Sequence, residues 1–305
     1  MRIVALFGPT GVGKTAAAVA LADRLRARGE DPVAVSADAL QVYAGLETLT
    51  GVASPREQAR LEHRLISFLP LDATFSAGQY AQLAHAEIDG LLAAGRRPLV
   101  VGGTGLYLRA ALTELSLRPP PPQGLRERLT EELEREGAPA LHARLRRLAP
   151  WAAASIEPQD RQRVVRALEL LALGELPDPR TGEPPDGHSQ LWSEEVRRPT
   201  LLVGLTMERE ALYRTIDVRV EAMLAAGAEA EARRAHAAGA SQTARKALGF
   251  DELLAGDVEA MKRRTRNYAK RQLTWMRKLA GVHLLDVTDR APVQSAAEIL
   301  ALLDG

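Results

Sequence analysis

The chain has no cysteine among its 305 residues and no excess of charge of one sign. The first absence excludes disulfides, thiolate catalysis and cysteine-ligated zinc sites. Because 40 Lys and Arg balance 39 Asp and Glu, a nucleic-acid partner has to be attracted by a local surface. No apolar run approaches the ~20 residues of a membrane span. Residues 1–7 read as a strand rather than as a leader, so we expect a cytoplasmic protein without a membrane partner, and we expect a monomer.

What the chain does contain is a hydrophobic fraction of 46% and an alternation of strand and helix patterns. Apolar runs at Ile3–Phe7, Val33–Val35 and Leu99–Val101 alternate with helical patterns near 14–29 and 77–94. Such alternation predicts an α/β fold with a parallel sheet flanked by helices.

A second half of the core follows after a region of different composition. Residues 198–207 and 282–287 read as strands, and 208–238 and 257–280 as helices. The intervening region begins with "RPPPPQ", continues with helix formers rich in Arg, Glu and Leu, and ends in a Pro/Gly-rich loop. The predicted division is a core of residues 1–118 and 200–305 with a helical insertion at 119–199.

The strongest motif is a phosphate-binding loop in "FGPTGVGKT", typical of nucleotide-binding and ATP-binding proteins. It follows the first apolar strand and leads into a helix, a context that argues against a chance Gly-rich turn. Backbone N–H groups, the helix N-terminus and Lys14 would surround a diphosphate, and the Thr15 hydroxyl is the expected Mg²⁺ ligand. The residues assigned to the diphosphate are Gly8, Pro9, Thr10, Gly11, Val12, Gly13, Lys14 and Thr15.

The acidic residue that nucleoside triphosphatases and kinases place after a second apolar strand is missing. The run "RPLVV" leads instead into Gly102-Gly103-Thr104-Gly105. Asp38 follows another strand, and ligands of open α/β sheets lie at the carboxyl ends of strands, so we expect Asp38 and Thr104 beside the phosphate loop. Two alternatives remain open: Asp38 as a helix cap, and Thr104 as part of a turn.

Eight blocks in order carry a resemblance that spans nearly the whole chain: "GPTGVGKT", "SADALQVYAGLE", "HRLISFLPLDATFSAGQYAQLA", "GRRPLVVGGTGLYLRAAL", "DRQRVVRALEL", "RVEAML", "KALGFDE" and "KRQLTWMRK". The sequence resembles the bacterial tRNA dimethylallyltransferases, also called tRNA isopentenyltransferases. The resemblance implies a P-loop NTPase-like core. It also implies transfer of a dimethylallyl group from dimethylallyl diphosphate to N6 of adenosine 37, just 3′ of the tRNA anticodon, with release of diphosphate.

The resemblance also implies roles for three residues. Asp38 is the expected base for the weakly nucleophilic N6 amine, Arg219 the expected partner of the leaving diphosphate, and Thr104 a contact to tRNA. From its sequence context alone, Arg219 could equally be a solvated helix residue. "LTGVA" at 49–53 and Phe250-Asp251 depart from the family pattern, which leaves RNA contacts there open.

Two stretches are expected to grip the anticodon stem-loop. In the insertion, Gln162 and Arg166 share one helical face, while Val164, Leu168 and Leu171 share another. Residues 262–278 carry eight Lys or Arg and no acid, with Met261, Tyr268 and Trp275 as the expected buried stripe; a solvated helix face is the alternative. The residues expected to contact tRNA are Asp38, Ala39, Leu40, Gln41, Thr104, Gln162, Arg163, Val164, Val165, Arg166, Lys246, Arg271 and Lys278.

Two other functions are compatible with a phosphate loop. A small-molecule kinase would use the insertion as a lid, but the missing acid and the basic helix argue against it. A non-enzymatic RNA-binding switch would not need Asp38 and Thr104 beside the pocket.

Overall fold

The computed structural model describes residues 1–115, 118, 120–122, 124–176, 178 and 191–305. Residues 119 and 123 of the predicted Pro-rich linker, and all of the predicted Pro/Gly-rich loop except Asp178, therefore lie outside the described residues. The chain divides into two compact units, residues 1–114 with 191–305, and residues 115–190. The predicted insertion at 119–199 overlaps the second unit but extends beyond its end. Arg197 donates its backbone N–H to Leu112 and its side chain to Asp89, so the segment before the next strand belongs to the first unit.

The first unit is built on a six-stranded parallel sheet in the order β3-β2-β4-β1-β5-β6. The strands are β1 (Ile3–Phe7), β2 (Pro32–Ser36), β3 (His63–Arg64), β4 (Arg97–Gly102), β5 (Thr200–Thr206) and β6 (His283–Asp286). In the middle of the sheet Ala5 pairs with Val100 on one side and Leu202 on the other. These buried apolar runs are the predicted strands, and the P-loop-like α/β fold is confirmed. The two-residue β3 was not predicted.

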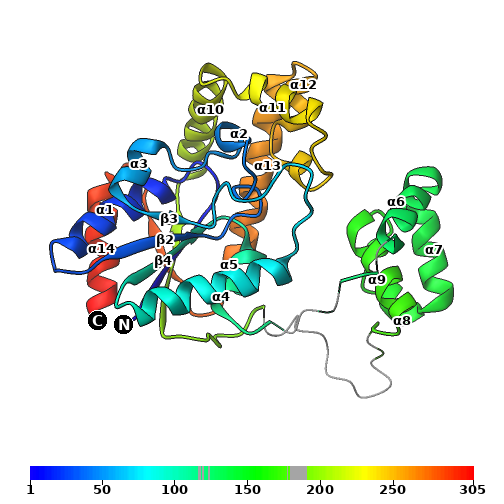
Figure 1. Cartoon of the computed structure of the whole chain (residues 1–305), viewed down its shortest axis with the longest axis horizontal. Helices are drawn as coiled ribbons and strands as arrows, with labels where there is room; N and C mark the ends of the chain where they lie inside the picture. Colours follow the sequence, from blue (N-terminus) through cyan, green and yellow to red (C-terminus); the bar gives the residue numbers. More distant parts are fainter. Residues whose placement is uncertain (116–117, 119, 123, 177, 179–190) are drawn as a thin grey trace. The chain divides into compact units, whose positions relative to one another are not determined.

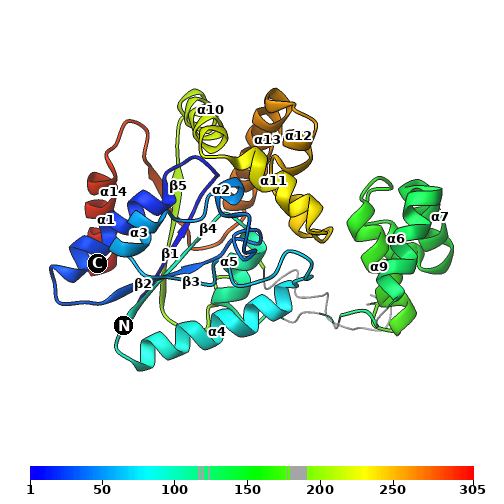
Figure 2. The ribbon, with the colours of Figure 1, turned by 45° about the horizontal axis from the view of Figure 1, so that its top comes forward.

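Helices cover both faces of this sheet (Figures 1 and 2). Helices α1 (Lys14–Arg26) and α14 (Pro292–Asp304) pack together on one face, and α4 (Ala77–Ala93) and α5 (Gly105–Leu112) on the other. The first face is closed by the largest apolar core cluster, which includes Val4, Leu21 and Ile299. This arrangement leaves the loops after β1, β2 and β4 free to form one site at the carboxyl edge of the sheet.

A second helical layer packs around the loop that follows β2. It consists of α2 (Glu47–Thr50), α10 (Arg209–Ala225), α11 (Ala228–Ala237), η2 (Ala244–Lys246), α12 (Phe250–Leu254) and α13 (Val258–Met276), and the short helix α3 (Pro55–Arg60) precedes β3. Its core joins Tyr43 and Leu46 of the loop to Val220 and Phe250 of the helices. The predicted helix at 208–238 is two helices, because Gly227 adopts a positive φ of 91° between them.

The second unit is a small helical domain with a core of its own. It contains α6 (Leu125–Glu136), α7 (Ala138–Leu148), α8 (Pro150–Ala153) and α9 (Arg161–Leu173). Leu129, Leu141 and Leu168 pack in its interior. No helix in the described part of the chain is long and apolar enough to cross a membrane.

Candidate active site

The phosphate loop lies between the end of β1 and the start of α1. Gly13 precedes the helix with φ 92° and ψ 23°, a left-handed conformation that a residue with a side chain adopts at a cost. No acidic residue occupies the first turn of α1, so the partial positive charge of its N-terminus is not neutralised from within the helix. This geometry suits an anion bound at the helix start.

Lys14 is held across the mouth of the loop. Its Nζ donates hydrogen bonds of 2.9 Å to the carbonyl oxygens of Gly8 and Pro9. Burial lowers the pKa of Lys14 to about 8, with Asp38 raising it and Arg219 lowering it further. Lys14, Asp38 and Arg219 are therefore close enough to interact electrostatically.

This shifted pKa predicts a pH-dependent affinity for diphosphate. Lys14 is charged below pH 8 and neutral above it, whereas a bound anion would return its pKa toward 10.5, so binding takes up a proton between these values. Between pH 8 and 10 the Kd for a diphosphate should rise about tenfold per pH unit. Isothermal titration across this range measures the slope. Lys14→Arg, which stays charged, should bind with a flat pH profile, and a flat wild-type profile would show that Lys14 does not titrate there.

Asp38 and Thr104 come together at the carboxyl ends of β2 and β4. Thr104 Oγ1 accepts the backbone N–H of Ala39 at 3.2 Å, and the Thr104 N–H donates to the Ala37 carbonyl. Asp38 Oδ1 accepts the N–H of Leu40 at 3.0 Å, and among the described residues no donor reaches its other carboxylate oxygen. A carboxylate oxygen thus remains free to accept a proton.

The helix-cap alternative for Asp38 is wrong, whereas Thr104 does lie in the turn between β4 and α5. The next helix begins only at Glu47, so Asp38 caps none. Thr104 occupies the N-cap position of α5, but its hydroxyl makes no capping hydrogen bond and instead joins the two loops.

Arg219 extends from α10 to the same site and is not a solvated helix residue. Burial lowers its pKa, while Asp38 and Glu57 raise it. A Cβ on Gly51 would lie 1.7 Å from Arg219 Nη2, so the guanidinium packs directly over the Gly51 backbone. Gly51 belongs to the block that departs from the family pattern. Within this chain, a side chain at position 51 would displace Arg219.

Tyr268 and Gln272 of α13, which were not predicted as site residues, also lie at the site. Burial raises the pKa of Tyr268 to about 12, with Asp38 raising it and a hydrogen bond to Thr104 lowering it. The buried Gln272 side chain bonds to Thr10 and Gly103. The sequence signal that could have identified Gln272 is its position on the buried face of α13. The buried positions of this helix are Met261, Thr265, Ala269, Gln272 and Met276. The predicted buried stripe was correct only at Met261, since Tyr268 and Trp275 are half-buried.

The basic residues of α13 fall into two groups. Lys262, Arg263, Arg264 and Arg266 in its first half form ion pairs with Asp or Glu. In the part of the chain that the structure describes, no carboxylate pairs with the later basic residues, which are Lys270, Arg271, Arg277 and Lys278. Arg271 lies over the Tyr268 ring and Lys278 over the Trp192 ring. The uncompensated charge therefore lies in the half that contains Arg271 and Lys278.

The other residues expected to contact tRNA divide by exposure. Lys246, Gln162 and Arg163 are exposed. The Gln41 carboxamide accepts from Ser36 Oγ and donates to the Gly51 carbonyl, so it anchors its own loop. Ala39 and Leu40 are half-buried.

Within α9 the structure corrects the expectation that all of Gln162–Arg166 faces RNA. Val164 and Val165 pack in the core of the second unit. Arg166 bonds to the fully buried Glu169, as does Arg126. Burial alone would raise the pKa of Glu169, but these two guanidinium groups hold it below its usual range. Arg166 thus has a structural role in this unit.

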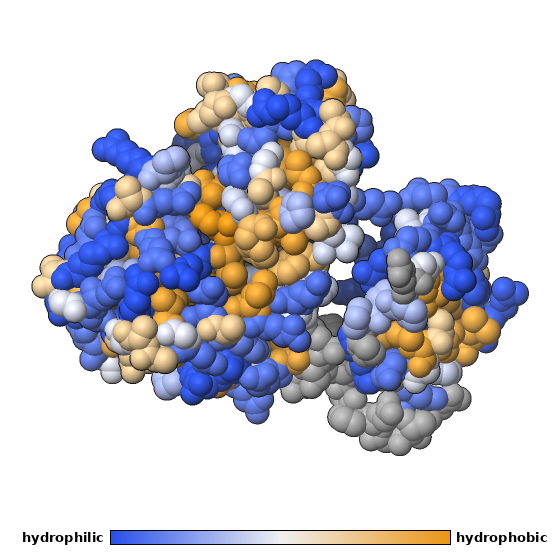
Figure 3. All heavy atoms as spheres, viewed as in Figure 1, coloured by the Kyte–Doolittle hydropathy of each residue, from blue (hydrophilic) through white to orange (hydrophobic). Residues whose placement is uncertain are grey.

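Apolar side chains line the loops near Asp38. Figure 3 shows hydrophobic residues gathered near the middle of the first unit, where Figure 1 places the loops after β2 and β3. Leu40, Leu69 and Phe75 are half-buried there, and the exposed Phe68 meets Phe75 edge-on at 5.6 Å between ring centroids. A small hydrocarbon group would find apolar contacts on this surface.

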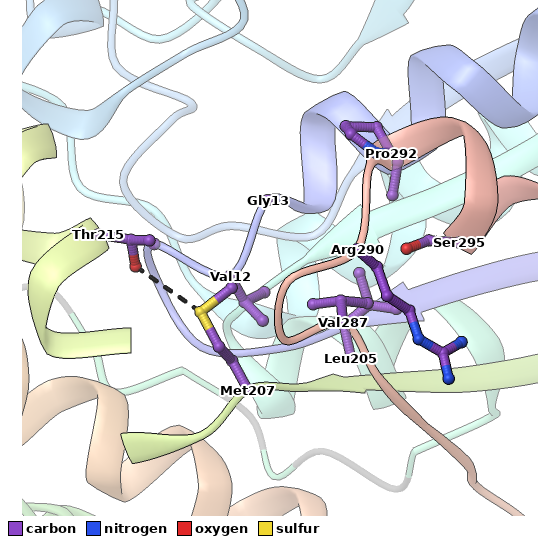
Figure 4. Close-up of a pocket in the computed structure, with 11 residues that line it drawn as sticks. Val12, Gly13, Leu205, Met207, Thr215, Val287, Arg290, Pro292 and Ser295 are labelled. Carbon is purple, nitrogen blue, oxygen red and sulfur yellow. Dashed lines mark hydrogen bonds between the residues drawn. The ribbon is translucent and has the colours of Figure 1, made fainter. Parts of the chain in front are cut away.

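A separate pocket of ≈ 200 Å³ lies against the phosphate loop, between β5, α10 and the start of α14 (Figure 4). Its wall is mainly apolar, and the Thr215 hydroxyl donates to Leu212 within its own helix. Arg290 at its edge pairs with Glu298. Asp38, Thr104 and Arg219 do not line this pocket, so it is distinct from the site that these three residues form.

Together these features define a P-loop-like α/β protein whose phosphate loop faces the Asp38 carboxylate and Thr104. A nucleotide-hydrolysing enzyme would instead carry an acidic residue after β4. A family model described as IPP transferase matches residues 41–279. The chain belongs to the IPP transferase family.

Similar proteins support this membership over the full length. The tRNA dimethylallyltransferase of Symbiobacterium thermophilum is 39% identical over 315 residues, covering 99% of this chain and 95% of that protein. The structure of the Bacillus halodurans tRNA isopentenylpyrophosphate transferase is 32% identical with a TM-score of 0.70, covering 100% and 96%. A eukaryotic dimethylallyltransferase described as acting on tRNA has a TM-score of 0.76 at 25% identity, covering 99% and 77%.

Proposed function

We propose that this protein is a tRNA dimethylallyltransferase. It transfers the dimethylallyl group of dimethylallyl diphosphate to N6 of adenosine 37, beside the tRNA anticodon, and releases diphosphate. The observation that carries the proposal is the contact between the Asp38 and Thr104 loops at a site shared with Lys14 and Arg219. This constellation provides a base, a cradle for the leaving group and apolar contacts for the five-carbon chain.

The reaction follows from the positions of these groups. Asp38 accepts a proton from the exocyclic amine as its nitrogen attacks the allylic carbon. The carbon–oxygen bond breaks, and the negative charge that develops on diphosphate is stabilised by the loop amides, Lys14 and Arg219. Thr104 holds the Asp38 loop in place through its bond to the Ala39 N–H while the flipped adenine occupies the site.

The residues present fit a magnesium ion held mainly through the substrate. No cluster of three or more metal-ligating His, Asp or Glu occurs among the described residues. Mg²⁺ commonly binds through one or two protein oxygens, waters and substrate phosphates, and Thr15 supplies such an oxygen. A bound Mg²⁺ would neutralise charge on the departing diphosphate. A tRNA substrate implies action in the cytoplasm, and the monomeric state stays a prediction.

Ligand protection against heat tests the proposed donor. Dimethylallyl diphosphate with Mg²⁺ should raise the Tm more than ATP with Mg²⁺ at equal concentration, since only the former fits both the loop and its apolar surroundings. A ligand present at a hundredfold above its Kd stabilises the fold by about 2.7 kcal/mol. Differential scanning fluorimetry measures the shifts. Stronger protection by ATP would favour a kinase.

The basic half of α13 predicts a salt-dependent grip on tRNA. Replacing Arg271 and Lys278 by Ala should weaken tRNA binding and reduce the slope of log K against log salt by about 1–2, because phosphate contacts are lost. Filter binding at several salt concentrations measures both. The control is Lys262→Ala with Arg263→Ala, which removes the same charge from ion-paired positions and should leave the slope unchanged. An unchanged slope in the Arg271→Ala, Lys278→Ala variant would show that these side chains do not contact tRNA phosphates and form only a solvated helix face.

A further inference from the structure

Gln272 connects two loops of the site that are far apart in the sequence. Its Oε1 accepts the backbone N–H of Thr10 at 2.8 Å, and its Nε2 donates to the carbonyl of Gly103 at 2.8 Å. The two bonds fix the orientation of the carboxamide, because a flipped amide would set donor against donor and acceptor against acceptor. The side chain is 4% exposed, so water does not replace either bond.

The packing around Gln272 is close. A Cβ on Gly103 would lie 2.3 Å from Gln272 Nε2, 3.2 Å from the Gly8 carbonyl oxygen and 3.4 Å from Lys14 Nζ. The phosphate loop, the turn before Thr104 and α13 therefore meet at this glycine. A displacement of the Gln272 side chain would move the peptide that carries Thr10 and the turn that carries Thr104.

Neighbouring positions of α13 touch the same turn. Tyr268, one turn earlier, lies close enough to Thr104 for that side chain to lower its pKa. Trp275, one turn later, packs on Gly105, where a Cβ would lie 2.2 Å from the indole. The helix that carries the uncompensated basic charge on its outer side thus rests its inner side on the diphosphate loop and the Thr104 turn.

We propose that Gln272 is a positioning residue that holds the phosphate loop and the Thr104 turn in register against the RNA-gripping helix α13. The proposal rests on the proposed function and adds a residue that touches neither substrate. The Thr10 N–H donates to Gln272, so the peptide it belongs to is fixed. Through Gln272, α13 therefore fixes the position of the phosphate loop, which carries Lys14, relative to the loops that carry Asp38 and Thr104.

Replacement of Gln272 by Leu keeps a buried side chain of similar size but removes both bonds. Because a misplacement of about 1 Å can cost about 100-fold in rate, we expect the single-turnover rate to fall by about 10–100-fold. The KM for dimethylallyl diphosphate should rise by about tenfold, while the Kd for tRNA stays within about twofold. Rates are normalised to the folded fraction measured by circular dichroism.

The matched control is Thr265→Val. Thr265 lies on the same buried face of α13, but among the described residues its hydroxyl donates only to the Met261 carbonyl of the same helix. This variant should keep the wild-type rate and KM. If Gln272→Leu also keeps the wild-type constants per folded molecule, or if tRNA and diphosphate affinities fall together, the positioning role is overturned.

Gln272→Glu provides a second readout if the Leu variant does not fold. A carboxylate accepts from Thr10 but repels the Gly103 carbonyl, whereas a protonated carboxyl restores the donor. Its activity relative to wild type should therefore recover as the pH falls from 8 to 5.5, and a constant ratio would contradict the proposal. Wild-type enzyme that transfers no label from dimethylallyl diphosphate to tRNA would instead refute the proposed function, which separates the two failures.

Discussion

Replacement of Asp38 by Asn is expected to lower the single-turnover rate of dimethylallyl transfer by about 10²–10⁴-fold, the usual contribution of a general base. Asn keeps the side-chain oxygen that accepts the Leu40 N–H, so the loop should retain its shape. What is lost is the carboxylate that can accept the proton from N6. The affinities for tRNA and for the diphosphate should change little.

Quenched-flow assays with enzyme in excess measure this rate. Asp72→Asn is the matched control, because it removes an exposed carboxylate from a neighbouring loop and should leave the rate unchanged. If Asp38→Asn instead loses tRNA affinity while the folded complex reacts at the normal rate, Asp38 is an RNA contact and the base lies elsewhere.

Lys14→Ala is expected to fail differently from Asp38→Asn. It removes a charged donor from the diphosphate and leaves the carbonyls of Gly8 and Pro9 without their hydrogen-bond partner. We expect weaker binding of dimethylallyl diphosphate together with a transfer rate lowered by about 10²–10³-fold, as for the loss of one oxyanion donor. The tRNA affinity should be unaffected.

Diphosphate affinity from calorimetry and the transfer rate under saturation separate the two effects. Lys14→Arg keeps the charge and should recover part of the lost affinity. Wild-type diphosphate affinity in Lys14→Ala would place the leaving group away from this loop.

The parts of the fold that could be predicted are those encoded locally. The strands around Ile3–Phe7 and Leu99–Val101 are continuous apolar runs, and the loop between Gly8 and Thr15 has a fixed spacing. The short β3 has two residues and therefore no periodic pattern. Helix α14 was not predicted, although its sequence carried a helix signal: a proline in the first turn followed by apolar residues at helical spacing.

The parts of the site that could not be predicted depend on contacts between distant segments. The block at 49–53 departs from the family pattern, and only the fold shows that Arg219 packs over its Gly51. Gln272 reaches Thr10 across 262 positions of the chain. On α13 a seven-residue spacing suggested a buried stripe through Tyr268 and Trp275. In the structure the face of α13 that packs against the phosphate loop carries Gln272, which is buried, and both rings are only half-buried. A local sequence pattern does not specify such contacts between distant segments of the chain.

Label transfer to a defined tRNA tests the central claim most directly. An unmodified transcript with adenosine 3′ of the anticodon is incubated with the enzyme, Mg²⁺ and dimethylallyl diphosphate labelled in the five-carbon group, or with γ-labelled ATP. We predict label from the dimethylallyl donor on that adenosine, no label from ATP, and no transfer to a matched transcript that carries guanosine at this position. Phosphoryl label from ATP on any acceptor, or no dimethylallyl label on the adenosine transcript, would contradict the account.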